Sequence, residues 1–165
     1  MVRFAEEKDL DRINEIRAQV SVLHAAGRPD IFKPGFCREL RDRAGELMRD
    51  ENSDILVAER DGVICGMASV EYLIRPESAY CRERRTYYIT EFGVDEAYRR
   101  RGVGRELLDF MRKDARDRGF FRMELDAWSF NADALAFYRA VGFQTFREFL
   151  EWDLAEGGET CPPGK

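Results

Sequence analysis

Residues 86–94, Thr-Tyr-Tyr-Ile-Thr-Glu-Phe-Gly-Val, constrain the fold of this chain most strongly. Apolar or aromatic side chains fall on both alternating faces of the stretch, which is typical of a strand covered on both sides. Only one charged residue, Glu91, stands among them. A turn with three arginines and two glycines follows, and an amphipathic helix begins at once. The sequence therefore predicts a central strand, a cationic turn and a helix in direct succession.

The same kind of patterning divides the rest of the chain into short strands and helices. Phe121, Met123, Leu125 and Ala127 alternate on one face of a predicted strand at 120–128. The other predicted elements are a strand at 2–5, helices at 9–26 and 38–50, a hairpin turning at Asp61-Gly62, a helix ending near 118, a helix at 131–140 stopped by Gly142, and a closing strand or strand pair at 143–154. This order indicates a mixed α/β fold, with a single domain over 1–154 and a flexible tail over 155–165.

The composition of the chain argues against three classes of protein: nucleic-acid-coating, membrane-spanning and metal-binding. A net charge of −5 argues against a protein that coats nucleic acid, although it leaves room for a local basic patch. The chain has no apolar run of membrane-spanning length and no visible secretory signal, so we expect a cytoplasmic protein without a membrane partner. Four cysteines without C-x-x-C spacing and a single histidine make a poor metal set. We expect no metal and buried free thiols.

The turn from Arg99 to Arg105 has the features of an anion site. A helix N-terminus presents free N–H groups and a partial positive charge, and glycines let the backbone approach a ligand closely. Successive N–H groups from Arg101 to Arg105 would then surround a pyrophosphate, with Arg99 and Arg100 adding attraction. A tight turn with solvated arginines is the structural alternative.

Two common phosphate motifs fit this turn poorly. A Walker A loop needs a lysine after its second glycine, and Arg105 stands there. A dinucleotide fingerprint needs a third small residue where Leu107 stands, and it normally opens the chain rather than following ninety residues. A nucleotide-dependent oxidoreductase is thus a weaker alternative.

Two blocks carry a resemblance to a known family. Arg-Arg-Arg-Gly-Val-Gly at 99–104 resembles the R/Q-x-x-G-x-G/A signature of the GNAT superfamily of N-acetyltransferases. Residues 131–143 resemble that family's N-x-x-A-x-x-x-Y-x-x-x-G-F helix. The resemblance implies acetyl-CoA as co-substrate and a mostly antiparallel sheet of about six to seven strands flanked by about four helices, splayed at the cofactor groove. It also implies a homodimer, as in many relatives.

The resemblance also implies roles for particular residues. Tyr138 would lie near the thioester sulfur as general acid; spacing alone favours a packed tyrosine. Asn131 would contact the coenzyme, whereas from its position it is a helix N-cap. Main-chain groups of β-strand residues would pair with the pantetheine arm. The predicted coenzyme-binding set is Phe92, Gly93, Val94, Arg99, Arg100, Arg101, Gly102, Val103, Gly104, Arg105, Asn131 and Tyr138.

Acetyl transfer to an amine requires a proton acceptor. An alkylammonium has a pKa near 10.4, so only about one molecule in a few thousand is neutral at pH 7. Glu91 is the first candidate base, because a carboxylate in an apolar strand is costly unless paired and burial raises its pKa. An ion pair with an arginine is the alternative for Glu91. Asp126, on the polar side of its strand, is the second candidate.

The sequence says least about the part of the site that binds the amine acceptor. In the family that the chain resembles, the first two helices and their connecting loop frame the acceptor, which here implicates His24, Asp30 and Phe32, with Trp128 as a wall or core residue. A turn-forming role is the alternative for Asp30. The sequence thus predicts an N-acetyltransferase acting on a primary amine of a small molecule or peptide. A non-catalytic acyl-CoA-binding sensor is the alternative function.

Overall fold

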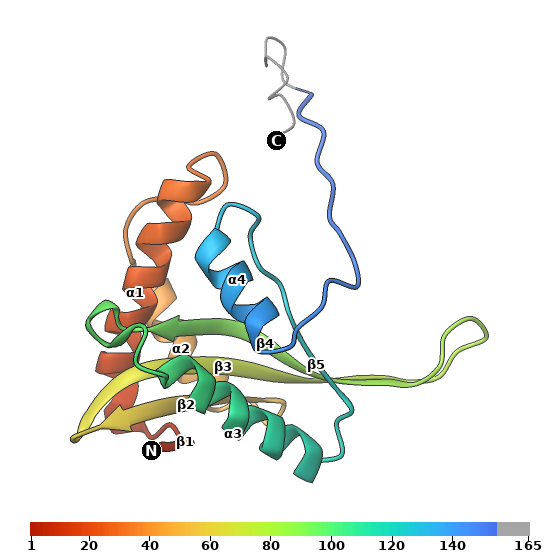
Figure 1. The fold of residues 1–165 in the computed structure, drawn as a ribbon, viewed down its shortest axis with the longest axis horizontal. Coiled ribbons are helices and arrows are strands. Elements are labelled where there is room, and N and C mark those ends of the chain that lie inside the picture. The colour runs from red at the N-terminus through yellow and green to blue at the C-terminus, as the bar shows by residue number, and fades with distance from the viewer. Residues whose placement is uncertain (155–165) are drawn as a thin grey trace.

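A five-stranded sheet organises the chain in the computed structural model, which describes residues 1–154 (Figure 1). The strands lie in the order β1 Val2–Phe4, β2 Ser53–Arg60, β3 Val63–Arg75, β4 Arg84–Val94 and β5 Arg122–Leu125. The first four strands pair antiparallel, and β5 pairs parallel to β4. β4 therefore has a strand on each side, as its apolar faces predict.

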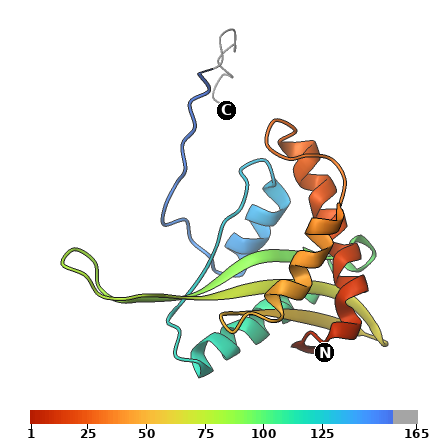
Figure 2. The same cartoon turned by 180° about the vertical axis from the view of Figure 1, so that it is seen from behind.

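Helices cover both faces of the sheet (Figures 1 and 2). They are η1 Glu7–Asp9, α1 Leu10–Gly27, α2 Arg38–Leu47, η2 Glu96–Tyr98, α3 Val103–Asp117 and α4 Ala132–Ala140. α1 and α2 lie on one face, and α3 and α4 lie on the other. The alternation of β2 explains this division: Leu56 and Ala58 enter the core beneath α3, while Ile55 and Val57 enter the core beneath α1 and α2.

Local sequence signals fix several of these elements. Asp61 and Gly62 have φ angles of 51° and 77°, as a type I′ hairpin turn requires. The inward side chains predicted for α3 are all buried: Leu107, Leu108, Met111 and Ala115. The mixed α/β class and the mostly antiparallel sheet are confirmed.

The prediction of six to seven strands is wrong for the described residues, which form five. The difference lies in residues 144–154, which follow α4 without helix or strand structure. Their side chains are exposed, Leu150 by 92% and Trp152 by 85%. An alternating pattern gives a strand only where a neighbouring edge accepts its main-chain hydrogen bonds. Within residues 1–154, no edge does so for this segment. The predicted tail at 155–165 lies outside the described residues.

The predicted strand alternation from Phe121 and the predicted burial of the free thiols are also wrong in part. Phe121 is 90% exposed, whereas Phe120 is buried beside Tyr87. The reason is that Gly119, at φ 76°, turns the chain before β5 begins, so the alternation does not extend back to Phe121. Of the three cysteines within residues 1–154, only Cys65 is buried; Cys37 and Cys81 are exposed free thiols outside helices and strands.

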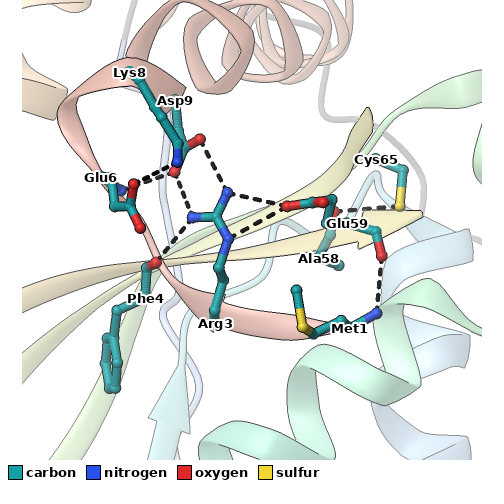
Figure 3. Close-up of polar contacts among 9 residues, drawn as sticks. All are labelled: Met1, Arg3, Phe4, Glu6, Lys8, Asp9, Ala58, Glu59 and Cys65. Atoms are coloured by element: carbon teal, nitrogen blue, oxygen red, sulfur yellow. Dashed lines mark hydrogen bonds and ion pairs between the residues drawn. The ribbon is translucent and has the colours of Figure 1, made fainter. Parts of the chain in front are cut away.

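Arg3 fastens the first strand to its neighbours (Figure 3). Its guanidinium donates to both carboxylate oxygens of Asp9, at 2.6 and 3.1 Å, and to Glu59 of β2 at 3.1 Å. Asp9 also accepts from the N–H of Glu6 at 2.8 Å. The hydrogen bond from Arg3 lowers the pKa of the Asp9 carboxyl below its usual value. Because the Asp9 side chain is only 4% exposed, this contact is shielded from water.

We predict that Asp9→Asn lowers the free energy of unfolding by about 2–3 kcal/mol at neutral pH, since a charged, shielded acceptor is lost. A lowered folded pKa gives stability that is full above the unfolded pKa of roughly 3.9 and is lost as pH falls through the folded value. Urea denaturation should therefore show a wild-type advantage that shrinks as the pH approaches about 3. The exposed Asp30 serves as control, and Asp30→Asn should change little. An advantage that is the same at both pH values would contradict the assignment.

Candidate active site

β4 and β5 part after four residue pairs. Their ladder joins residues 86–89 to residues 122–125, and β4 then continues to Val94. A register shift against β3 leaves Thr90 as an extra residue on β4, which is a β-bulge and bends the strand. Within residues 1–154, no strand lies along the β5 side of β4 beyond this bulge. The predicted splaying of the sheet is thus present at this point.

The open edge of β4 presents the main chain of Phe92 and Val94. The N–H of Asp95 donates to the carbonyl of Cys65 at 3.0 Å. Hydrogen-bonded pairs alternate along antiparallel strands, so the N–H and C=O groups of Phe92 and Val94 point away from β3. Arg99 confirms this direction, because its Nε donates to the Val94 carbonyl at 3.2 Å. An extended ligand with amide groups fits such an edge.

Gly93 makes room for α1 rather than for the open edge. A Cβ at this position would lie 2.9 Å from the Ile16 side chain and 3.2 Å from Val20. The close approach at Gly93 is therefore made by a helix, while its predicted contact with the coenzyme stays a prediction.

The turn before α3 uses two glycines for two different reasons. Gly102, the N-cap of α3, has φ 83°, and a Cβ there would meet no atom within 4 Å. Its conformation, not its surroundings, favours glycine. A Cβ on Gly104 would lie 3.0 Å from the Phe137 ring and 3.5 Å from Phe92. Gly104 therefore lets the start of α3 pack closely against α4 and β4.

The arginines of the turn face solvent. Arg99, Arg100 and Arg101 are exposed, and Arg100 has a positive φ of 59°. Arg101 also lies over the Tyr98 ring at 5.6 Å from its centre. Because Gly102 has no side chain with which to cap the helix, the first N–H groups of α3 remain available to an anion. The predicted coenzyme residues Val103 and Gly104 supply two of these groups.

Tyr138 lies against the open edge. Its ring centre is 6.0 Å from that of Phe92 and 5.8 Å from that of Phe143. Burial raises the pKa of Tyr138 to about 12. Within residues 1–154 its hydroxyl has no hydrogen-bond partner. The phenol is therefore protonated at neutral pH and has its proton available.

Glu91 is held in an ion pair. Arg17 of α1 donates to both oxygens of the Glu91 carboxylate, at 2.7 and 2.9 Å. Arg17 is only 5% exposed, and it also donates to Asn14 at 2.8 Å and to the Leu40 carbonyl. The arginine pairing left open by the sequence is thus the arrangement that the structure shows. Glu91 as a base stays a prediction, which would require this pair to loosen.

Asp126 follows β5 directly and has a neutral partner. The Tyr88 hydroxyl donates to its carboxylate at 2.5 Å. Burial, and then this hydrogen bond, raise the pKa of Tyr88 to about 12. Since Ile89 and Leu125 form the last pair of the β4–β5 ladder, Asp126 and Glu91 both lie where the strands part. Within residues 1–154, Asp126 forms no ion pair with a cationic side chain, unlike Glu91.

Asn131 acts as the N-cap of α4. Its side-chain oxygen accepts from the N–H of Ala134 at 3.2 Å. The capping alternative is therefore present, and coenzyme contact stays a prediction. Arg105, farther along the exposed side of α3, lines a groove of about 210 Å³ with Asp109, Arg112 and Phe143 among its other walls.

The residues predicted at the acceptor end come together. His24 stacks on Phe32 at 5.0 Å between ring centres, and Phe32 meets Trp128 edge-on at 5.2 Å. Burial lowers the pKa of His24, so it is neutral at pH 7. Asp30 binds Arg28 at 2.7 Å, and Arg28 lies over Trp128. These contacts make an aromatic wall at the end of α1.

Sequence reasoning missed Arg17 and Tyr88. Arg17 stands four residues after Ile13 and next to Ile16, so it lies on the apolar face of α1, where a cation signals a buried partner. The position of Arg17 on an apolar helix face could therefore have predicted its buried ion pair from the sequence. The pairing of Tyr88 with Asp126 could not have been predicted, because it depends on the parallel register of β4 and β5.

Two further features are absent from residues 1–154. These residues contain no group of three or more His, Cys, Asp or Glu side chains placed to hold a metal ion. They also contain no helix whose length and apolar character would let it cross a bilayer.

Comparison with known proteins decides the family. The family model described as acetyltransferase (GNAT) family matches residues 18–143. The chain belongs to this family. The GNAT match covers α2 to α4 and most of α1, and so includes the strands that part, the turn before α3 and Tyr138. The family resemblance of the two sequence blocks is confirmed.

Several curated proteins and solved structures are similar to this chain. The N-alpha-acetyltransferase RimI of Mycobacterium tuberculosis is 36% identical over 140 residues, covering 82% of this chain and 73% of the relative. The L-ornithine N5-acetyltransferase NATA1 of Arabidopsis thaliana is 35% identical over 123 residues, or 73% of this chain. A crystal structure of a mutant BH1408 protein from Bacillus halodurans has a TM-score of 0.90 at 26% identity, covering 93% of this chain and 99% of that one. The chain spans about half the length of the first curated relatives it matches.

Proposed function

We propose that this GNAT protein is an N-acetyltransferase that transfers an acetyl group from acetyl-CoA to a primary amine of a small molecule or peptide. One observation carries the proposal: the Phe92 ring lies against both Tyr138 and the start of α3. A helix start with free N–H groups, a strand edge with unpaired main-chain groups and a phenol therefore meet at one residue. We place the protein in the cytoplasm, as expected from its sequence.

The chain has groups that fit each part of the coenzyme. The N–H groups from Arg101 to Arg105 would hold the diphosphate, supported by the positive end of α3. The outward main chain of Phe92 and Val94 would pair with the amides of the pantetheine arm. Asn131 would add a contact from α4. These residues fit acetyl-CoA in charge, in hydrogen-bonding capacity and in order along one edge.

The protein's own groups then manage two protons. Acetyl-CoA supplies an activated acetyl thioester. Asp126, directly or through water, would accept the proton of the ammonium so that a neutral amine attacks. Tyr138 would donate a hydrogen bond, and finally its proton, to the departing sulfur. We favour Asp126 over Glu91 because Arg17 occupies both Glu91 oxygens.

Chemistry at the acceptor end favours an amine with an apolar neighbour. His24, Phe32 and Trp128 supply an aromatic wall beside the arginine-paired carboxylate of Glu91. The names of the relatives include an α-amine and an amino-acid side-chain amine as acceptors. We therefore place amino acids and N-terminal peptides first among the candidates.

The decisive experiment measures free thiol released from acetyl-CoA in the presence of a panel of amines: amino acids, N-terminal peptides, polyamines and aminoglycosides. Release that depends on both the protein and one amine class supports the proposal. Coenzyme binding by thermal shift without release for any amine would favour the non-catalytic sensor instead.

Gly102 tests the coenzyme site. We predict that Gly102→Asp weakens acetyl-CoA binding by at least about tenfold, since it puts a carboxylate where the diphosphate would lie and removes roughly 1.4 kcal/mol or more of binding free energy. Isothermal titration calorimetry gives the affinity. Gly62→Asp is the matched control, because Gly62 has a similar φ of 77° and equally open surroundings in the β2–β3 turn. Equal affinities for the two variants would remove the diphosphate assignment.

Tyr138 tests the acid. Tyr138→Phe keeps the ring contacts and removes the hydroxyl, so we predict a fall in kcat of about 10²–10⁴-fold with little change in acetyl-CoA affinity. Tyr72→Phe, which removes a hydroxyl bonded to Asp54 elsewhere in the fold, is the control and should keep its kcat. A Tyr138→Phe enzyme with full kcat would show that the phenol is not the acid.

Asp126 and Glu91 test the base. Asp126→Asn should abolish the rise of kcat/KM with pH on the acidic side, because that rise reports deprotonation of the base in the free enzyme. Glu91→Gln should keep the rise and lower stability to urea, because it leaves Arg17 buried without its carboxylate. The reverse outcome for the two variants would assign the base to Glu91.

A further inference from the structure

Asp95 is the residue at which the chain leaves β4 and turns toward α3. Its N–H extends the pairing with β3 by donating to the Cys65 carbonyl at 3.0 Å, and its own carbonyl accepts from the N–H of Tyr98 at 2.8 Å. Its carboxylate caps η2, because Oδ1 accepts from the N–H of Ala97 at 2.9 Å. The main chain and the side chain of Asp95 therefore both fix this change of direction.

Helix α1 holds the other oxygen of the Asp95 carboxylate. Oδ2 accepts from Arg12 at 2.7 Å and from the side-chain amide of Gln19 at 3.0 Å. Arg12 and Gln19 are about two helical turns apart, so they lie on one side of α1. The Gln19 side chain also accepts from the N–H of Glu96 at 3.1 Å. One amide thus binds both Asp95 and the first residue of η2, at a place where Asp95 is only 6% exposed.

Asp95 is the last of three contacts between α1 and alternate residues at the end of β4. Glu91 binds Arg17, and Gly93 lies against Ile16. Alternate residues of a strand face the same side, so all three contacts lie on the face that α1 covers. The part of β4 beyond its bulge is therefore supported by α1, although it has no strand partner on the β5 side within residues 1–154.

The proposed coenzyme site has two parts that one ligand must reach together. The main chain of Phe92 and Val94 would hold the amides of the pantetheine arm, and the N–H groups of residues 101–105 would hold the diphosphate. η2 lies between these two parts along the chain, so its direction sets the distance between them. A ligand with two linked groups binds tightly only where the geometry lets both be engaged at once. A change in the direction of η2 would therefore weaken binding even with both parts intact.

We propose that Gln19 and Asp95 are positioning residues for acetyl-CoA, which hold η2 on α1 so that the strand edge and the start of α3 fit the two halves of one ligand. This inference rests on the proposed function, because it takes acetyl-CoA as the ligand. Neither side chain would touch the coenzyme, since their hydrogen bonds go to α1, to η2 and to each other.

Gln19→Ala tests the inference against acetyl-CoA and against its two halves. ADP carries the diphosphate half, and S-acetylpantetheine carries the arm. We expect the variant to bind acetyl-CoA at least about tenfold more weakly than the unmodified chain, as measured by isothermal titration calorimetry. Its affinities for ADP and for S-acetylpantetheine, measured by NMR titration, should each change by less than about twofold. A loss of local structure at either part would instead weaken the binding of that half.

A second variant keeps the shape of the side chain. Gln19→Glu sets a carboxylate opposite that of Asp95, and like charges repel at this separation. This variant should weaken the binding of acetyl-CoA at least as much as Gln19→Ala does, again without loss for either half.

Ser53→Ala is the matched control. The Ser53 hydroxyl donates to the Leu47 carbonyl at 2.6 Å, and Ser53 is 4% exposed. The change thus also removes a side-chain hydrogen bond that joins a helix to a strand, but far from η2 in the fold. It should lower the free energy of unfolding and leave all three affinities unchanged.

The possible outcomes separate this inference from the proposed function. If Gln19→Ala binds acetyl-CoA as tightly as the unmodified chain does, or loses affinity equally for one of the halves, the positioning role is wrong and the proposed function stands. An unmodified chain that does not bind acetyl-CoA would overturn both.

Discussion

Two parallel strands that share only four residue pairs determine where every candidate group lies. β4 bends at the Thr90 bulge and parts from β5, so its main chain from Phe92 to Val94 is left without a strand partner. An unpaired strand edge inside a fold needs some other hydrogen-bonding partner. The turn before α3 and the helix α4 flank this edge. The candidate site thus lies where the pairing of β4 with β5 stops.

The two carboxylates at the parting have opposite surroundings. Glu91 is neutralised by a buried guanidinium, which ties α1 to β4 and stabilises the frame of the groove. Asp126 is held by a phenol, a neutral donor that orients the carboxylate without cancelling its charge. Breaking a buried ion pair leaves an uncompensated charge. Glu91 is therefore better suited to stabilising the fold than to exchanging protons. Asp126, which has no such ion pair, is better suited to proton transfer.

The outline of the fold was readable from local signals. Asp61-Gly62 specifies its turn by conformation alone, and the apolar spacing of α3 specifies its buried face. What could not be read depends on contacts between distant segments. Tyr88 finds Asp126 only through the parallel register, and Gly93 is explained only by the side chains of α1. At 144–154, the alternation of side chains was plain, but no strand edge within residues 1–154 pairs with it.

Arg99 gives this edge a built-in competitor. Its guanidinium already engages the Val94 carbonyl, so an arriving amide exchanges one hydrogen bond for another instead of adding one. A typical hydrogen bond contributes a net of about 0.5–1.5 kcal/mol, and an exchange forfeits most of that gain. The released guanidinium would then be free to bind negative charge at the start of α3, whose N-cap, Gly102, follows three residues after Arg99. Binding of the ligand's amide group at Val94 would in this way release Arg99 to pair with the ligand's anionic group.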